Sequence, residues 1–193
     1  MDTIVSAFDK QMDALFAELY GLIPDNIVGF EDASVQALVH EMLCAEGLTL
    51  ATAESCTGGA IASRFTAMAG ASTYFLLGAV TYGNEAKRDV LGVDYDDIMR
   101  YGAVSETVAR QMAEGARRVS GADYAVATTG IAGPGGGTPE KPVGTVWFAV
   151  ATPYRTVSVM RDSGTDRGQV INRAAAYAIR MLYDELKRDS GRR

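Results

Sequence analysis

Thr52-Ala53-Glu54-Ser55-Cys56-Thr57-Gly58-Gly59 is the stretch that decides the fold of this chain. Residues 48–51, just before it, are apolar and partly β-branched, which predicts the end of a buried strand. Residues 60–65, just after it, have the composition of a helix. We therefore expect Ser55 at a strand-to-helix turn on the carboxyl edge of a sheet, where open α/β folds bind their ligands.

This turn can be interpreted in two ways. In the first, the start of the helix offers a ligand free backbone N–H groups and a positive dipole end. Thr57, Gly58 and Gly59 then line the approach, because glycines carry no side chain that would keep a substrate away. In the second, Ser55 or Thr57 is only an N-cap and the glycines only pack the helix. The spacing of the residues supports both interpretations.

The rest of the chain alternates between strand and helix patterns. Apolar runs over about 48–53, 76–82 and 123–129 predict three strands separated by helices, which favours parallel pairing. Two alternating runs, 143–152 and 155–161, predict a hairpin, so at least one neighbour is antiparallel. We expect a three-layer α/β/α fold with a mixed, mostly parallel sheet of about five strands. Helices lie on both faces, and a C-terminal helix covers 166–188.

Residues 1–33 are predicted to be an N-terminal helix and linker, ahead of a domain over 34–193. The apolar stripe of this helix consists of Ile4, Val5, Phe8, Met12, Leu15, Phe16 and Leu19. Such a stripe must be buried against its own domain or against a partner subunit. Since twofold dimers are the commonest assemblies, we expect a homodimer or a higher homo-oligomer.

The composition argues against several classes of protein. The net charge is −6 without a dense basic run, and the C-terminal arginines fit a solvated helix face, which argues against nucleic-acid binding. There is no apolar run of membrane-spanning length and no basic region of a signal peptide, so we expect a soluble cytoplasmic protein. Two cysteines give no disulfide framework, and the single histidine, His40, removes a multi-histidine metal site. No metal and no redox cofactor is implied.

Three segments are expected to meet at the sheet edge: Ser55 after the first strand, residues 82–87 after the second, and a glycine loop after the third. A serine hydroxyl becomes a nucleophile only when a base takes its proton. With one histidine in the chain, Lys87 and Tyr82 are the candidate bases, and a lysine serves when its pKa is lowered. The alternative is that Lys87 is a solvated helix lysine and Tyr82 a packing residue. Cys56 is a rival nucleophile whose expected fate is burial.

The loop over 130–142 is the second candidate for ligand binding. Glycines at this density let backbone N–H groups converge on an anion, and Lys141 adds a positive charge. The glycines are Gly130, Gly133, Gly135, Gly136 and Gly137. The loop is not a Walker A motif or a dinucleotide fingerprint, because its glycine spacing differs and a strand follows it. The alternative is a flexible surface loop.

Four segments resemble the CinA carboxyl-terminal domain family. They are 48–59 (LTLATAESCTGG), 78–92 (GAVTYGNEAKRDVLG), 102–106 (GAVSE) and 130–147 (GIAGPGGGTPEKPVGTVW). The similarity covers about residues 34–188 in unbroken order, and it implies a three-layer α/β/α fold with a mixed sheet. Two-domain members of the family also carry a nucleotide-pyrophosphatase domain that these residues do not resemble, so we expect no pyrophosphatase activity.

The resemblance also implies an activity. The family includes amidases that hydrolyse the carboxamide of nicotinamide mononucleotide to nicotinate mononucleotide and ammonia, so a small nucleotide is the implied substrate. The serine of the Glu-Ser-Cys motif, here Ser55, is the family's proposed nucleophile. The lysine of the Asn-Glu-Ala-Lys motif, here Lys87, is its partner, and Tyr82 is the third member. We then expect N–H groups over 55–59 to bind the oxyanion, and the glycine loop with Lys141 to hold the phosphate.

Two rival functions stay open at this point. One is a non-catalytic module that binds a nucleotide, or a partner in competence-linked DNA uptake or repair. The other is an amidase of another class that acts on a different small amide. Release of ammonia from nicotinamide mononucleotide, nicotinamide and glutamine would separate these functions.

Overall fold

The computed structural model describes residues 34–192. The helix and linker predicted over 1–33 lie outside these residues, so they and the boundary at residue 34 stay predictions. Within the described range, no helix is both long enough and apolar enough to cross a membrane.

A five-stranded mixed sheet forms the middle layer of the fold. Its strands lie in the order β2-β1-β3-β4-β5. β1 pairs in parallel with β2 and β3, whereas β4 pairs antiparallel with β3 and β5. The strands are β1 (Leu50–Glu54), β2 (Phe75–Val80), β3 (Tyr124–Gly130), β4 (Thr145–Ala151) and β5 (Thr156–Asp162). The predicted sheet, with parallel pairs first and a hairpin last, is confirmed.

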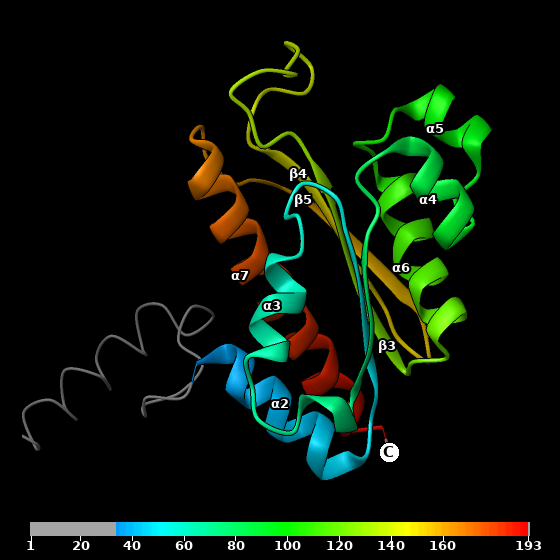
Figure 1. The fold of residues 1–193 in the computed structure, drawn as a ribbon, viewed down its shortest axis with the longest axis vertical. Helices are drawn as coiled ribbons and strands as arrows, with labels where there is room; N and C mark the ends of the chain where they lie inside the picture. The colour runs from blue at the N-terminus through cyan, green and yellow to red at the C-terminus, as the bar shows by residue number, and fades with distance from the viewer. Residues whose placement is uncertain (1–33, 193) are drawn as a thin grey trace, which may run out of the picture. The chain divides into compact units, whose positions relative to one another are not determined.

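Helices cover both faces of this sheet (Figure 1). α6 packs on one face with α4 and α5 beside it, and α7 packs on the other face together with α3. Figure 1 shows α2 on the same side as α3 and α7. The helices are α2 (Val35–Glu46), α3 (Ala60–Thr66), α4 (Asn84–Leu91), α5 (Tyr95–Tyr101), α6 (Glu106–Ser120) and α7 (Arg167–Ser190), and a short 3-10 helix, η2 (Ala71–Thr73), precedes β2. The three predicted layers and the C-terminal helix are confirmed.

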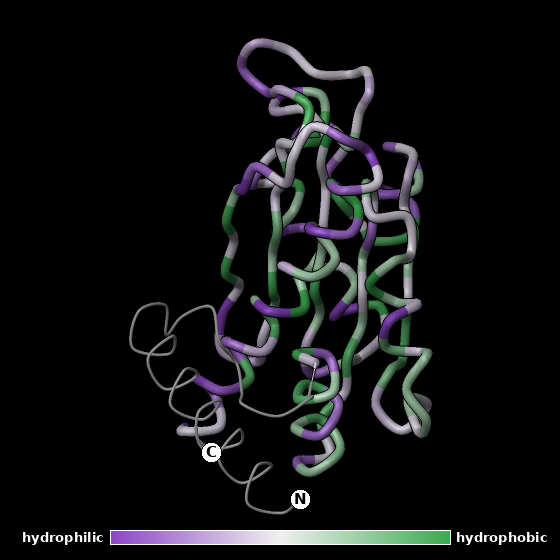
Figure 2. The backbone as a smooth tube through the Cα atoms, turned by 90° about the vertical axis from the view of Figure 1, so that its left-hand side faces the viewer, coloured by the Kyte–Doolittle hydropathy of each residue, from purple (hydrophilic) through white to green (hydrophobic). Residues whose placement is uncertain are grey.

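Small side chains let α6 approach the sheet closely. Alanines occupy alternate positions of the central strands on the face that α6 covers: Ala51, Ala53, Ala125, Ala127, Ala149 and Ala151. The facing stripe of α6 carries Val108, Ala109, Met112, Ala113 and Ala116. Figure 2 shows long hydrophobic stretches in the middle of the molecule, and hydrophilic residues in the loop at the top and in short stretches elsewhere. Because successive side chains of a strand point to opposite faces of the sheet, every second residue of these strands packs against α6.

The carboxyl ends of β1, β2 and β3 lie at one edge, because these three strands run parallel. Backbone hydrogen bonds continue the pairing just beyond the strands: Ser55 N donates to Thr128 O (3.0 Å) and Thr81 N donates to Glu54 O (2.9 Å). Each strand leads here into a segment that the sequence had singled out. This edge is where the candidate site lies.

Candidate active site

Ser55 and Lys87 form a buried pair at this edge. Lys87 Nζ lies 3.2 Å from Ser55 Oγ. Ser55 follows β1 and is 8% exposed, and Lys87 comes from the inner side of α4 and is 1% exposed. The structure therefore brings the predicted pair within hydrogen-bond distance, and Lys87 is not a solvated helix lysine.

The surroundings of Lys87 suit a neutral amine. Burial lowers the pKa of Lys87, because loss of water disfavours the charged form. Besides Ser55, Nζ contacts the backbone carbonyls of Thr81 at 2.8 Å and Tyr82 at 3.2 Å. A neutral amine has two N–H donors and one lone pair, which match two carbonyls and a hydroxyl that can give up its proton. The arrangement is thus suited to a lysine that accepts the proton of Ser55.

Glu54 is the residue that fixes the start of α3. Its side chain is fully buried, although it is charged. Its carboxylate accepts hydrogen bonds from three backbone amides, those of Gly59 (3.0 Å), Ile61 (3.1 Å) and Ala62 (2.7 Å). These are N–H groups that a helix start leaves without partners, so Glu54 satisfies them and ties α3 to the end of β1.

The start of α3 differs from both interpretations of the sequence. The N-cap is Gly59, at a φ of 99°, and neither Ser55 nor Thr57 caps the helix. The amide of Gly58 donates to Ser55 O at 3.1 Å, and the amide of Gly59 donates to Glu54. The prediction that amides over 55–59 bind an oxyanion therefore has no support in this geometry for Gly58 and Gly59.

Glu54→Gln is expected to destabilise the protein by about 2 kcal/mol, the range for losing hydrogen bonds to a buried charge. The introduced amide group would point a donor at backbone donors, which leaves them unsatisfied. Urea unfolding measures the change, and Glu140→Gln on the exposed glycine loop is the matched control, expected to change stability by less than about 0.5 kcal/mol. Equal stability of the two variants would contradict the capping role.

Cys56 and Thr57 are both turned into the protein. Thr57 Oγ1 lies 2.7 Å from Thr128 Oγ1 on β3, and Thr57 is 3% exposed, so its hydroxyl joins the turn to the sheet. The predicted contact of the Thr57 side chain with substrate has no support in this geometry. Cys56 is 5% exposed, and burial raises the pKa of its thiol to about 12, so it is not a thiolate at neutral pH. The expected burial of Cys56 is confirmed.

Tyr82 meets Lys87 through its backbone rather than its phenol. Its carbonyl accepts from Lys87 Nζ, whereas its side chain is 60% exposed and its hydroxyl accepts from Arg167 Nη2 at 3.2 Å. Among the residues that the structure describes, the phenol makes no hydrogen bond with Ser55 or Lys87. A proton relay through Tyr82, which the sequence had left as an option, is not part of this arrangement.

Arg167 is a residue of this edge that the sequence analysis missed, because the C-terminal arginines were assigned to a solvated face. It is the first residue of α7, and its Nη1 donates to Gly133 O at 2.8 Å. Together with its bond to Tyr82, this joins the glycine loop to the end of β2. A cation in the first turn of a helix opposes the helix dipole. An arginine directly after the N-cap Asp166 is therefore unfavourable for the helix, and this feature of the sequence could have identified Arg167 as a candidate site residue.

The structure divides the glycines of the predicted anion loop into two groups. Figure 1 shows this loop rising between β3 and β4, next to the start of α7. A Cβ on Gly130 or Gly133 would lie 2.7 Å or 2.6 Å from a valine of the neighbouring segment, so these two glycines meet a packing requirement. A Cβ on Gly137 would likewise lie 2.8 Å from Val143 N. A Cβ on Gly135 would meet nothing within 4 Å and one on Gly136 only Ile131 at 3.8 Å; both of these residues are exposed, so a ligand can approach their backbone.

Lys141 is held by the protein itself. Its Nζ donates to the carbonyls of Tyr101 and Val104, both at 2.8 Å. Two of its three N–H donors therefore fasten the loop to the last residue of α5 and to the segment that follows it. The predicted role of Lys141 as the phosphate-binding cation has no support in these contacts.

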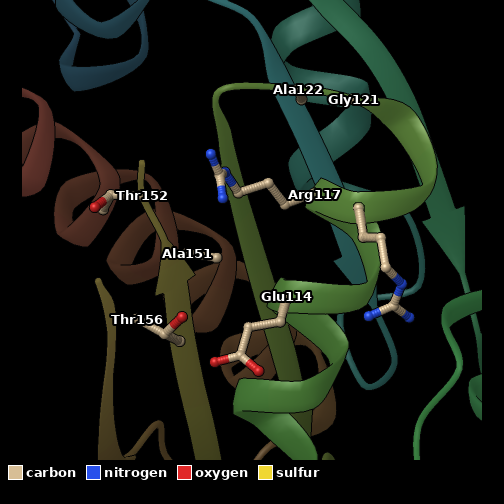
Figure 3. Close-up of a pocket in the computed structure, with 8 residues that line it drawn as sticks. Glu114, Arg117, Gly121, Ala122, Ala151, Thr152 and Thr156 are labelled. Carbon is tan, nitrogen blue, oxygen red and sulfur yellow. The ribbon is translucent and has the colours of Figure 1, made fainter. Parts of the chain in front are cut away.

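A separate pocket of about 360 Å³ lies at the opposite edge of the sheet. Figure 3 shows Glu114 and Arg117 of α6 on one side and Thr152 and Thr156 on the other. Because β4 runs antiparallel to β3, its end at Ala151 lies at the edge where β3 begins. This pocket is therefore not part of the Ser55–Lys87 site.

Residues 32–186 match the family model of the CinA C-terminal domain. A CinA-like protein from Chlorobium chlorochromatii is 55% identical over 168 residues, which cover 83% of this chain and 40% of that protein. A CinA-like protein from Shewanella sediminis is 45% identical over 184 residues, which cover 95% of this chain and 42% of that protein. The chain thus spans about 40% of the length of these relatives.

Solved structures with the same fold agree with this match. The competence/damage inducible protein CihA from Agrobacterium tumefaciens is 40% identical with a TM-score of 0.75, over 83% of this chain and 99% of that one. The competence damage-inducible protein A from Klebsiella pneumoniae is 38% identical with a TM-score of 0.76, over 79% of this chain and 95% of that one. Sequence and fold lead to the same conclusion: this chain belongs to the CinA C-terminal domain family.

Proposed function

We propose that this chain is an amidohydrolase that converts nicotinamide mononucleotide to nicotinate mononucleotide and ammonia. The observation that carries the proposal is the buried contact of 3.2 Å between Lys87 Nζ and Ser55 Oγ. A lysine whose pKa is lowered by burial can act as a base near neutral pH, which a solvated lysine cannot do. The nucleotide substrate follows from the resemblance of the motifs around this pair.

In the first half of the reaction, the Ser55 hydroxyl gives its proton to the neutral Lys87 amine, and Oγ attacks the carboxamide carbon. The carbon becomes tetrahedral and its oxygen becomes an oxyanion. The Lys87 ammonium then returns the proton to the leaving nitrogen, which departs as ammonia. The product of this half is an ester between Ser55 and the pyridine carboxyl group.

The oxyanion needs hydrogen-bond donors that the protein does not use elsewhere. In the Ser55 turn, the amides of Ser55, Gly58 and Gly59 donate to other groups of the protein. The amides of Cys56 and Thr57 have no hydrogen-bond partner in another residue within the described part of the chain. They follow the nucleophile directly, and we assign the oxyanion to them.

In the second half, a water molecule replaces the departed ammonia. Lys87 takes a proton from this water, the hydroxide attacks the ester carbon, and the tetrahedral intermediate forms again. Collapse of the intermediate releases the carboxylate and returns the proton to Ser55 Oγ. Both halves thus use the same pair, which makes the reaction a hydrolysis without a metal in any step.

The phosphate of the substrate needs a cation and free amides at the same edge. Arg167 supplies the cation: its guanidinium has five N–H donors, of which Gly133 O and the Tyr82 hydroxyl take two. Gly135 and Gly136 are exposed on the adjoining loop. We therefore place the phosphate between Arg167 and these glycines, and not on Lys141.

Ammonia release with nicotinamide mononucleotide, nicotinamide and glutamine as alternative substrates tests this function. We expect release from the mononucleotide and much less from nicotinamide, which lacks the phosphate. Release from glutamine alone would indicate an amidase of another class. No release from any of the three, with intact binding of the mononucleotide, would indicate a binding module.

A further inference from the structure

A second pair of a nucleophile and a base lies on α2, outside the Ser55–Lys87 site. Cys44 is exposed, and His40 lies one helical turn before it. The Cys44 thiol is 4.0 Å from Nδ1 and 3.9 Å from Nε2 of the imidazole. Both ring nitrogens thus lie at the limit of hydrogen-bond distance to the sulfur, and the nitrogen that carries no proton can accept the proton of the thiol.

Residues from other elements hold this pair in place. The His40 ring packs edge-on against Tyr74, with 5.3 Å between the ring centroids, and Tyr74 is 1% exposed. Thr73 Oγ1 lies 3.9 Å from Cys44 Sγ and donates its own proton to Gly70 O at 2.9 Å. Since the Thr73 hydroxyl donates its proton to Gly70 O, its oxygen can only accept from the thiol.

The pair opens into a cavity of about 390 Å³. Its lining comes from α2 and from the segment around η2: His40, Leu43, Cys44, Gly70, Thr73 and Tyr74. Apolar and polar groups both line this space, and the exposed sulfur stands at its surface. When a small molecule reacts with the thiol, the group that stays bound to the sulfur can therefore lie in this cavity.

We propose that Cys44 is a site of reversible thiol modification, assisted by His40, that takes low-molecular-weight disulfides into this cavity. The other cysteine differs in every respect that matters for this chemistry. Cys56 is 5% exposed, and burial raises the pKa of its thiol to about 12. The modification is therefore selective for Cys44, and it is independent of the amidase proposal.

The reaction is a thiol–disulfide exchange. The Cys44 thiol gives its proton to His40, and the sulfur attacks one sulfur of the small disulfide. A new S–S bond forms to Cys44 as the original S–S bond breaks. The leaving thiolate takes the proton from the imidazolium and departs as a thiol. Cys44 is oxidised, one half of the disulfide is reduced, and a second thiol reverses the step.

The test uses dithiodipyridine, a disulfide whose released thione is followed by its absorbance, with the whole chain. We expect one rapid equivalent in the native protein and two after denaturation, since the chain has two cysteines. Cys44→Ser is expected to remove the rapid equivalent. His40→Gln is expected to slow it by about tenfold or more at pH 7, because this variant lacks the base that takes the thiol proton. Glu41→Gln, next to His40 on the exposed face of α2, is the matched control and is expected to keep the parent rate.

Two outcomes would overturn the proposal. One is a His40→Gln variant that melts like the parent and reacts at the parent rate, which would leave Cys44 as an ordinary surface thiol. The other does not depend on any variant: Cys44 in the native chain reacts no faster than the same thiol in the unfolded chain at the same pH. Intact-mass measurement and peptide mapping assign the reacted cysteine in each case.

Discussion

Ser55→Ala is expected to abolish amide hydrolysis while the fold stays intact. Removing the nucleophile from a pair that acts as a unit costs about four orders of magnitude in turnover or more. Within residues 34–192, the Ser55 hydroxyl has one hydrogen-bond partner, Lys87 Nζ, so the free energy of unfolding should change by only about 1 kcal/mol. Ammonia release from nicotinamide mononucleotide measures the first effect, and thermal unfolding measures the second.

The neighbouring cysteine supplies the matched control for this experiment. Cys56→Ser changes one atom in the same turn, at a side chain that is buried and protonated. We expect this variant to keep turnover within about tenfold of the parent, a shift of about 1.4 kcal/mol in the barrier. The opposite pattern, an active Ser55→Ala and an inactive Cys56→Ser, would make Cys56 the nucleophile. Calorimetry with Ser55→Ala should still detect binding of the mononucleotide, because the phosphate contacts do not involve the serine.

The fold could be predicted because the hydrophobic pattern of each strand and helix can be seen within a short stretch of sequence. Alternation along β4 and β5 indicated a hairpin, and helical stretches between β1, β2 and β3 indicated parallel strands. From parallel pairing alone, the carboxyl ends of those strands had to share an edge. The meeting of Ser55 and Lys87, which are 32 residues apart, then followed from topology together with the family motifs.

The rest of the site depends on side-chain contacts that no local pattern records. The sequence shows that Glu54 precedes Ser55, but only the backbone path shows that its carboxylate turns onto three amides of α3. Lys141 lies beside glycines in the sequence, yet its ammonium reaches carbonyls about 40 residues away. Arg167 meets Tyr82 across 85 residues. The position of a lysine beside glycines in the sequence was therefore a poor guide to the contacts that this lysine makes in the fold.

Lys87→Met is expected to reduce turnover about as much as Ser55→Ala, because the two groups act as one unit. Methionine is close to lysine in length and apolar, so it suits a position that is 1% exposed. Lys87→Arg is expected to rescue little, since a guanidinium stays protonated and cannot take the serine proton. Near-parental activity of Lys87→Arg, in a variant that still folds, would reduce Lys87 to a source of positive charge.

The pH dependence of turnover in the parent enzyme shows whether Lys87 acts as a base or only as a positive charge. Burial lowers the pKa of Lys87, and the active form in this mechanism is the neutral amine. Turnover should therefore rise with pH through the lowered pKa of Lys87 and then level off. A profile that falls as pH rises through this range would show that the protonated lysine is the active form.

The free energy of unfolding should also depend on pH. The direction of this change follows from the number of protons that Lys87 binds in the folded and in the unfolded chain. An unfolded lysine has a pKa of about 10.4, and the folded value of Lys87 is lower because the side chain is buried. Between these two values the unfolded chain binds one proton more than the folded chain, so stability rises with pH in that window. Lys87→Met lacks this group, and the parent should therefore gain stability relative to the variant as pH increases. Urea unfolding of both proteins at pH 7 and pH 9 gives the comparison, and equal changes in the two would mean that buried Lys87 keeps its proton across this range.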